Sequence, residues 1–353
     1  MSDKWEVANF SLSTNVQNET KRQIFANGQM QARINVRIQA TIPGTDKDYQ
    51  LTESDLQSLK LIDYNTKQEL TGNWNYSRVE REEFLHTMPG EYTAAPVEPI
   101  ADDSQTVVLW VSSAVIDDKR IGAQITELGE TTAIVTTTGG YFDSSITIDA
   151  IRPITYTINE VTVTREDTAA GYWYKDVLYG TNWTNYRYAW DQDNYYVQSK
   201  KYPFVKVDRH KVDIDGTQQP YASYNYFRDA FAYMGLGNDR DVSIFFMPQM
   251  GGSTTTTRGV LAKNSYNNIA TLASVKVNQR NNQLCLTRIL FGNGWVSWFS
   301  NWQQDTWFTI YDEYGNYGHF TVKTNASNTI SIMTRYVNRE SSADSETIDT
   351  AKL

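Results

Sequence analysis

Four tryptophans lie close together in the last quarter of the chain, with amide side chains between them. They are Trp295, Trp298, Trp302 and Trp307, and the amides are Asn293, Asn301, Gln303 and Gln304. Aromatic rings stack on the apolar faces of sugars, while amides exchange hydrogen bonds with hydroxyl groups. The mixture predicts a glycan site whose residues are Trp295, Trp298, Trp302 and Gln303. The alternative interpretation is that Trp295, Phe299 and Trp307 pack in a core and the other residues cover an edge.

A second aromatic cluster lies near the middle of the chain. Its expected binding residues are Trp183, Tyr186 and Trp190, and Tyr188, Tyr195 and Tyr196 are close to them in sequence. Tyrosine and tryptophan give a large contact area at a low cost in conformational entropy. The same two interpretations apply here, because rings exposed on a sheet form an interaction surface and rings facing inward form a core.

Acidic residues in the same half of the chain leave a glycoside hydrolase open as an alternative function. Such enzymes need two carboxyl groups at a set separation, which sequence spacing does not display. The acids available are Asp191, Asp193, Asp239, Asp241, Asp305, Asp312 and Glu313. The competing interpretation is that they are turn residues, whose side chains bond nearby backbone amides.

Two short acidic segments have the alternating oxygen ligands that calcium uses. The weak calcium candidates are Asp191 and Asp193 in the first segment and Asp213 and Asp215 in the second. Neither segment matches the twelve-residue loop of an EF-hand. We therefore interpret both as turns and predict no metal site.

Signatures of the common enzyme classes are absent from the sequence. The chain has no G-x-S-x-G, H-E-x-x-H, P-loop or G-x-G-x-x-G pattern. Its one cysteine, Cys285, lies in an apolar run and is expected to be buried. The three histidines, His86, His210 and His319, are scattered and have no cysteine neighbours, which argues against structural zinc. We predict no catalytic residues and no cofactor.

Charge and length restrict the partners and the place of action. The chain has 353 residues, and 32 basic against 41 acidic residues give a formal net charge of −9. An acidic surface repels phosphate backbones, so nucleic acid is not an expected partner. The polar N-terminus lacks the apolar core of a signal peptide, and no apolar run is long enough for a spanning helix. We expect synthesis in the cytoplasm, with release by lysis or as part of a particle.

Hydrophobic periodicity predicts an all-β protein. Apolar residues alternate with polar ones from Met30 to Ala40, and about seven short strands with turns between them are predicted in the first half. In the second half, Thr306–Tyr311 and Gly318–Lys323 are expected to form a hairpin, and Gly251–Gly259 is interpreted as a loop. Thr52 is expected to cap a short helix. Tyr224, Phe227, Phe231 and Met234 recur at helical spacing and predict the one helix of the second half.

The segment Phe25-Ala26-Asn27-Gly28, followed by the alternating strand, resembles the opening of bacterial immunoglobulin-like modules found in adhesins. The resemblance covers residues 25–40 and implies an immunoglobulin-like β-sandwich in the first half of the chain. The rest of the sequence shows no family resemblance.

The predicted organisation is two β-sandwich-like domains in series. We expect an N-terminal arm over residues 1–22, a sandwich over 23–165, an aromatic-rich β domain over 166–338 and a mobile tail over 339–353. The first domain would dock or oligomerise, and the second would recognise a surface glycan or a protein partner, as in adhesins, lectins or phage particles. The alternatives are a self-assembling lattice or fibre protein, a membrane-targeting toxin and the hydrolase. We also expect a homo-oligomer.

Overall fold

The chain divides into two compact units, each described by itself. The first comprises Met1–Ile154 with Tyr314–Asn316, and the second comprises Thr155–Glu313 with Tyr317–Leu353. The structure is a computed structural model. It describes residues 4–16, 19–91, 104–127, 133–215, 228–236, 241–263, 269–292, 306–325, 329–336 and 347–349. The predicted boundary at 165/166 lies inside a single strand of the second unit.

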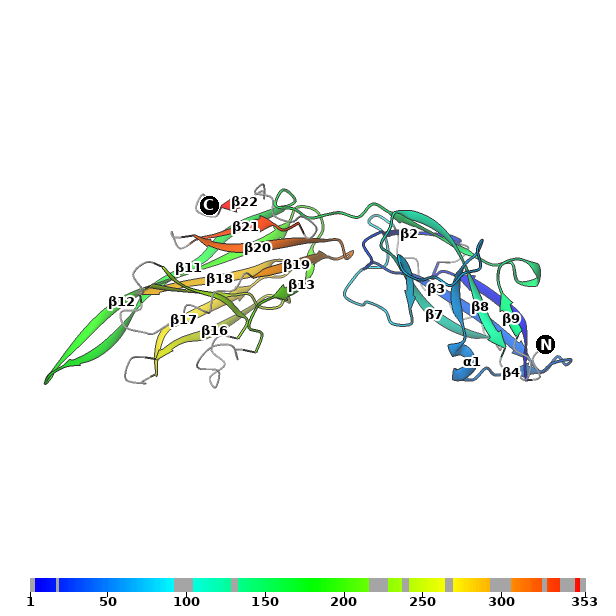
Figure 1. Ribbon diagram of the computed structural model, residues 1–353, viewed down its shortest axis with the longest axis horizontal. Coiled ribbons are helices and arrows are strands. Elements are labelled where there is room, and N and C mark those ends of the chain that lie inside the picture. Colours follow the sequence, from blue (N-terminus) through cyan, green and yellow to red (C-terminus); the bar gives the residue numbers. More distant parts are fainter. Residues whose placement is uncertain are drawn as a thin grey trace. The chain divides into compact units, whose positions relative to one another are not determined.

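The first unit is built from two five-stranded sheets (Figure 1). The first sheet has the order β1-β3-β7-β6, with β4 paired to β3. Its strands are β1 (Glu6–Ser13), β3 (Ala32–Thr41), β4 (Asp48–Tyr49), β6 (Trp74–Ser77) and β7 (Gln105–Ser113). The second sheet has the order β2-β10-β8-β5, with β9 paired to β8. Its strands are β2 (Lys21–Phe25), β5 (Lys60–Asp63), β8 (Asp117–Glu127), β9 (Ala133–Thr136) and β10 (Ile146–Ile151).

The core of this unit follows from period-two alternation in its strands. In β3 every second residue is buried, and Ile34, Val36 and Ile38 have no exposed surface. The second sheet contributes Ile121 and Ile148, which are also fully buried. Both sheets therefore turn an apolar face inward, and the predicted strand from Met30 to Ala40 is confirmed.

Two short elements connect the strands of the first unit. The helix α1 (Glu53–Gln57) begins with the predicted cap, because the Thr52 hydroxyl accepts from the Asp55 amide and the Asp55 side chain accepts from the Thr52 amide. The 3₁₀ turn η1 (Gly140–Phe142) precedes β10. Residues 1–22, expected to be an arm, contain β1, which pairs with β3 across a β-bulge.

The second unit contains two five-stranded sheets and a separate two-stranded ribbon (Figure 1). The β12 sheet has the order β11-β12-β18-β15-β14, with β11 (Val161–Tyr179), β12 (Asn182–Ser199), β18 (Leu284–Gly292), β15 (Asp241–Phe246) and β14 (Ala230–Leu236). The β19 sheet has the order β13-β19-β20-β21-β22, with β13 (Phe204–His210), β19 (Trp307–Asp312), β20 (Tyr317–Asn325), β21 (Thr329–Thr334) and β22 (Thr347–Asp349). The ribbon pairs β16 (Thr254–Lys263) with β17 (Ile269–Gln279).

The helix predicted in the second half is wrong where the structure describes it. Phe231 and Met234 lie in β14, which pairs with β15, whereas Tyr224 and Phe227 lie outside the described residues. A short apolar run fits both the helical and the strand periodicity, and pairing with a neighbouring strand decides between the two structures. The all-β fold itself is confirmed. The tail predicted over 339–353 includes β22, which pairs with β21.

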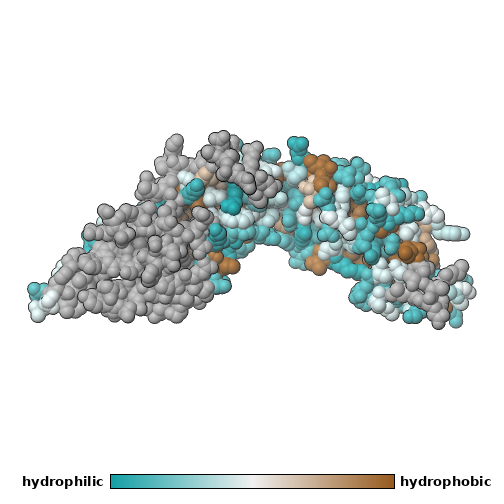
Figure 2. All heavy atoms as spheres, in the orientation of Figure 1, coloured by the Kyte–Doolittle hydropathy of each residue, from teal (hydrophilic) through white to brown (hydrophobic). Residues whose placement is uncertain are grey.

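The described surface in the view of Figure 2 is largely hydrophilic, with separate hydrophobic patches. Among the described residues, no helix is long and apolar enough to cross a membrane.

Candidate functional site

The outer face of the β19 sheet holds a set of half-buried aromatic rings. Strand alternation places Phe308, Ile310 and Phe320 on the inner side, where they have no exposed surface. Their neighbours in sequence therefore lie on the opposite side. We call this side the aromatic face and define it by His210 of β13, Trp307 and Tyr311 of β19, and Tyr317 and His319 of β20, which are all partly exposed.

The register of three strands brings these rings together. His210 is the cross-strand partner of Trp307, and Tyr311 is the partner of Tyr317. The His210 and Trp307 rings stack with centroids 3.4 Å apart and an angle of 11°. His319 meets the edge of Trp307 at 6.0 Å and of Tyr317 at 5.3 Å. Tyr311 and Tyr317 are tilted at 5.6 Å. The five rings thus form one continuous patch.

Hydrogen bonds to neighbouring side chains fix two of these rings. The Tyr311 hydroxyl donates to Asp208 Oδ2 at 2.8 Å. His319 Nδ1 and Thr309 Oγ1 share a hydrogen bond of 2.8 Å. Because both partners belong to the same sheet, the rings are held in place before any ligand arrives, which lowers the entropic cost of binding.

Two cations lie against the aromatic face. The Arg335 guanidinium is 4.7 Å from the Trp307 ring, and the Lys206 ammonium is 5.4 Å from the Tyr311 ring. Both distances fall within the range of cation–π attraction. Acceptor groups of a ligand on the rings could therefore meet a positive charge at either end of the patch.

The electrostatics of the face keep its histidines neutral at neutral pH. Burial lowers the pKa of His210, Arg335 lowers it further and Asp208 opposes the shift. Burial also lowers the pKa of His319, and His210 and Arg335 act in the same direction. Burial and the bond to Asp208 raise the pKa of Tyr311. A neutral imidazole has both a donor and an acceptor nitrogen, as hydroxyl ligands require.

The structure describes only part of the predicted glycan site. Trp295, Trp298, Trp302 and Gln303 lie outside the described residues. Trp307, which sequence reasoning weighed as a core residue, is partly exposed on the aromatic face. Trp183 and Tyr186 occupy β12, opposite Leu178 and Lys175 of β11.

Trp190 lies on the β12 sheet, not on the aromatic face. It pairs with Gly171 of β11, and a Cβ atom at residue 171 would collide with the Trp190 indole. The ring therefore covers backbone of its own sheet, which is the familiar use of glycine opposite an aromatic residue.

Among the calcium candidates, Asp193 pairs with an arginine side chain. Asp193 is fully buried and accepts from Arg165 Nη2 at 2.8 Å, and its cross-strand partner is the fully buried Arg288. Burial lowers the pKa of Arg288 to about 10, although the charges of Tyr195 and Asp193 act to raise it. Asp191 lies on the same side of β12. Asp213 is buried beside Ala230, and Asp215 is exposed. The described residues hold no group of three acidic, His or Cys side chains suited to a metal.

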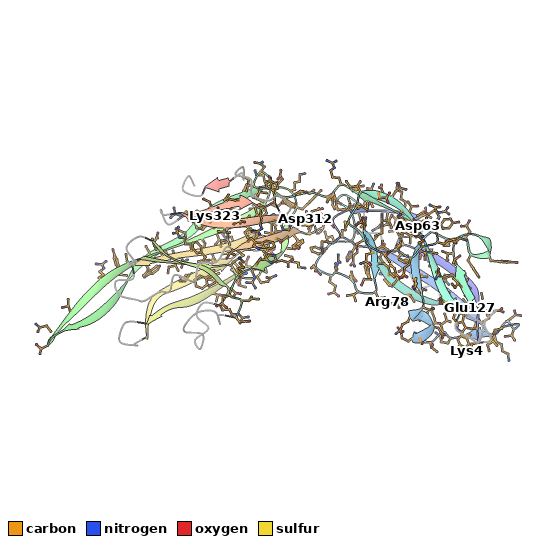
Figure 3. All side chains as sticks on the ribbon, in the orientation of Figure 1. Lys4, Asp63, Arg78, Glu127, Asp312 and Lys323 are labelled. Carbon is orange, nitrogen blue, oxygen red and sulfur yellow. The ribbon has the colours of Figure 1, made fainter. Side chains whose placement is uncertain are left out.

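The structure also places three of the other acids considered for glycoside hydrolysis. Asp312, labelled in Figure 3, is fully buried and accepts from the Tyr156 hydroxyl at 2.9 Å. Burial and Asp312 raise the pKa of Glu313. Asp241 begins β15, whereas Asp239 and Asp305 lie outside the described residues.

Sequence reasoning missed the histidines of the aromatic face. It treated them as scattered, although the predicted hairpin of 306–311 and 318–323 is confirmed and its alternation places Trp307, Tyr311 and His319 on one side. What it lacked was the pairing of β13 with β19, a long-range contact that no local pattern reveals. Cys285 is buried, as predicted.

Comparisons with known proteins yield no family. No protein-family model matches the chain, and no curated protein matches its sequence. Among solved structures, the chain is similar to the C-terminal domain of the AgI/II polypeptide BspA of Streptococcus agalactiae, with 8% identity, a TM-score of 0.18, and coverage of 90% of this chain and 97% of that one. A likeness this weak shows neither a shared fold nor a shared function.

Proposed function

We propose that this protein is a non-enzymatic binding protein and that its second unit recognises surface glycans through the aromatic face. The single observation that carries the proposal is the continuous patch of five partly exposed rings on one side of the β19 sheet. Half-exposed rings with hydrogen-bonding groups beside them suit sugars, which present apolar ring faces and hydroxyls together.

The dimensions of the face favour an oligosaccharide over a single sugar. Trp307 and Tyr311 are four residues apart on β19, which corresponds to about 13 Å along a strand. Arg335 lies against Trp307 and Lys206 lies against Tyr311, so both ends have a donor. A chain of sugar units along β19 would meet an aromatic platform and a cation at each end.

A glycan array tests the proposal with the full chain and two variants. Trp307→Ala and Tyr317→Ala should each lose at least tenfold in apparent affinity, about 1.4 kcal/mol. Tyr49→Ala is the matched control, because Tyr49 is a partly exposed tyrosine in the first unit and should leave binding unchanged. Circular dichroism confirms that each variant folds. If Trp307→Ala binds the same glycans as strongly as the parent, the aromatic face is not the site.

A specific observation favours self-assembly as a second candidate function. β11 is an edge strand, and no strand in the described part of the chain pairs with its outer edge. Beyond the pair Gly171–Trp190, β11 and β12 pair only with each other, and Figure 1 shows them running on past the other strands of their sheet. A two-stranded ribbon is marginally stable alone, and open edges invite pairing with another chain.

The sequence of β11 is complementary to itself in an antiparallel arrangement. A two-fold axis midway between Lys175 and Asp176 sets Lys175 of one copy opposite Asp176 of the other. Opposite charges stabilise such cross-strand pairs. Light scattering of the parent should show an oligomer. Lys175→Asp should produce a monomer, and the double variant Lys175→Asp/Asp176→Lys should restore the oligomer. A parent that is monomeric at every concentration rules this candidate out.

A further inference from the structure

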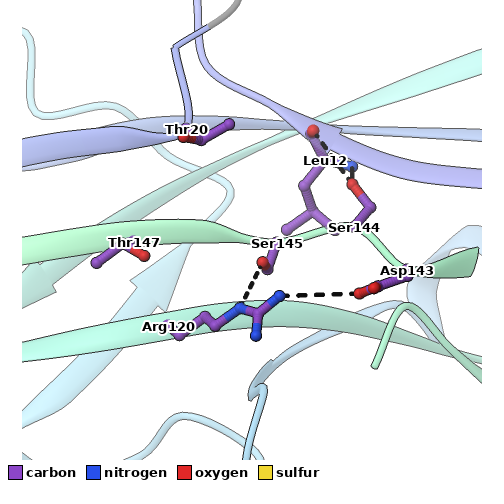
Figure 4. A pocket seen from close by; sticks show the side chains of 7 residues that line it. All are labelled: Leu12, Thr20, Arg120, Asp143, Ser144, Ser145 and Thr147. Atoms are coloured by element: carbon purple, nitrogen blue, oxygen red, sulfur yellow. Dashed lines mark hydrogen bonds and ion pairs between the residues drawn. The ribbon is translucent and has the colours of Figure 1, made fainter. Parts of the chain in front are cut away.

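The first unit has a polar hollow of about 470 Å³ on its second sheet, apart from the aromatic face (Figure 4). Its lining includes Leu12 of β1, Arg120 of β8, Thr147 of β10 and residues beside these strands. Thr147 is the cross-strand partner of Arg120 on one side and of Lys21 on the other. The volume lies within the range of small-molecule sites.

Arg120 is held in one orientation at this hollow. Its guanidinium carbon lies 3.5 Å from the centre of the Tyr64 ring, and its Nε donates to Ser145 Oγ at 2.8 Å. Its Nη2 is 3.8 Å from Asp143 Oδ1, which is longer than a hydrogen bond. The same Asp143 oxygen accepts from the Tyr64 hydroxyl at 2.6 Å. Asp143 is the one acidic residue among those that line the hollow, and it approaches Arg120 without a hydrogen bond.

The neighbouring side chains supply hydroxyl groups. Thr20, Ser145 and Thr147 line the hollow with Arg120. Ser144 has a structural task, since its hydroxyl accepts from the Leu12 amide at 2.9 Å and so ties the segment before β10 to β1. A fixed guanidinium suits a carboxylate, which it binds through two parallel hydrogen bonds, and hydroxyl side chains suit a ligand rich in hydroxyls.

We propose that this hollow binds the carboxylate of an acidic sugar, with Arg120 as the anion-binding residue. The ligand carboxylate takes the position near Arg120 that Asp143 now approaches, while Thr20 and Thr147 meet the sugar hydroxyls. Asp143 is then a competitor of the ligand, and removing its charge should strengthen binding. This site is independent of the aromatic face and of the function proposed for it.

Titration calorimetry with D-glucuronate, D-glucose and acetate tests the inference on the full chain. Glucuronate should bind at least tenfold more tightly than glucose or acetate. Arg120→Gln should lower glucuronate affinity at least tenfold, and Asp143→Asn should raise it severalfold. Both residues are well exposed, with 44% and 60% of their side chains accessible, so neither change removes a core contact.

Two controls separate this site from others. Lys119→Gln removes a cation adjacent in sequence that pairs with Asp63, and it should leave glucuronate affinity unchanged. Trp307→Ala should also leave it unchanged. Glucuronate binding no tighter than glucose binding, affinity unaffected by Arg120→Gln, or affinity weakened by Asp143→Asn would each overturn the inference. Inorganic phosphate binding as tightly as glucuronate would show a general anion site and overturn the sugar assignment.

Discussion

The imidazole of His210 lies flat on the indole of Trp307, with ring centroids 3.4 Å apart and an angle of 11°. The two residues are far apart in sequence and meet because β13 and β19 are neighbouring antiparallel strands. The stack stiffens the Trp307 end of the aromatic face, since each ring restricts the other. Several measurable consequences depend on this contact and on the buried charges of the second unit.

The histidines of the face should make stability depend on pH. Their pKa values in the fold lie below the value of 6.5 that the unfolded chain has. Below about pH 6.5 the unfolded chain therefore binds more protons, so the free energy of unfolding falls as pH decreases toward the folded pKa values. Thermal melts between about pH 7.5 and about pH 5 measure this slope.

The variants His210→Phe and His319→Asn should flatten that slope. Phenylalanine keeps a ring on Trp307, and asparagine can keep the hydrogen bond to Thr309. A smaller slope should remain, because burial also lowers the pKa of His86 in the first unit. A double variant with the full slope of the parent would show that the face does not cause it.

Asp193 should be essential for the stability of the second unit. It lies fully buried between the guanidinium of Arg165, at 2.8 Å, and the cross-strand Arg288. Asp193→Asn leaves those cations without a buried anion and should cost about 3 kcal/mol in free energy of unfolding, measured by urea denaturation. Glu166→Gln breaks the more exposed pair with Arg280 and should cost less than about 1 kcal/mol. Equal costs would contradict this account.

Gly171 should tolerate no side chain while Trp190 is present. A Cβ atom there would meet the indole far inside contact distance. Gly171→Ala should therefore destabilise the protein by about 2 kcal/mol, as overpacking does. Gly251→Ala is the matched control, because no atom lies within 4 Å of its added Cβ. In a Trp190→Ala background the clash is absent, so adding Gly171→Ala should cost little further stability. If Gly171→Ala costs as much in that background as in the parent, the clash is not the cause.

Strand patterns in the sequence predicted much of the fold. The alternation in β3, the Thr52 cap and the hairpin of β19 and β20 all depend on local chemistry, and the structure confirms them. β8 was not predicted, because it begins with the charged run Asp117–Arg120 that reads as a loop. The first part of β16 falls in the predicted loop Gly251–Gly259, because its threonines and glycine are typical of loops.

The candidate site was less predictable than the fold. Local pattern indicated Trp307 and its neighbours as an aromatic cluster, yet it could not show which rings lie on a shared face. That depends on register between β13, β19 and β20, which is set by long-range pairing. Likewise, the pair Asp191 and Asp193 resembled ion ligands in sequence, but pairing with β11 and β18 places arginines beside them.

Imidazole NMR gives the most direct test of the central claim that the aromatic face binds glycans. The chain has three histidines, of which His210 and His319 lie on the face and His86 lies in the first unit, where its ring is tilted against Trp110. With histidine labelled by nitrogen-15, titration with the strongest glycan from the array should shift the signals of His210 and His319 and leave that of His86 unchanged. Saturating glycan that leaves both face signals unmoved would contradict the account.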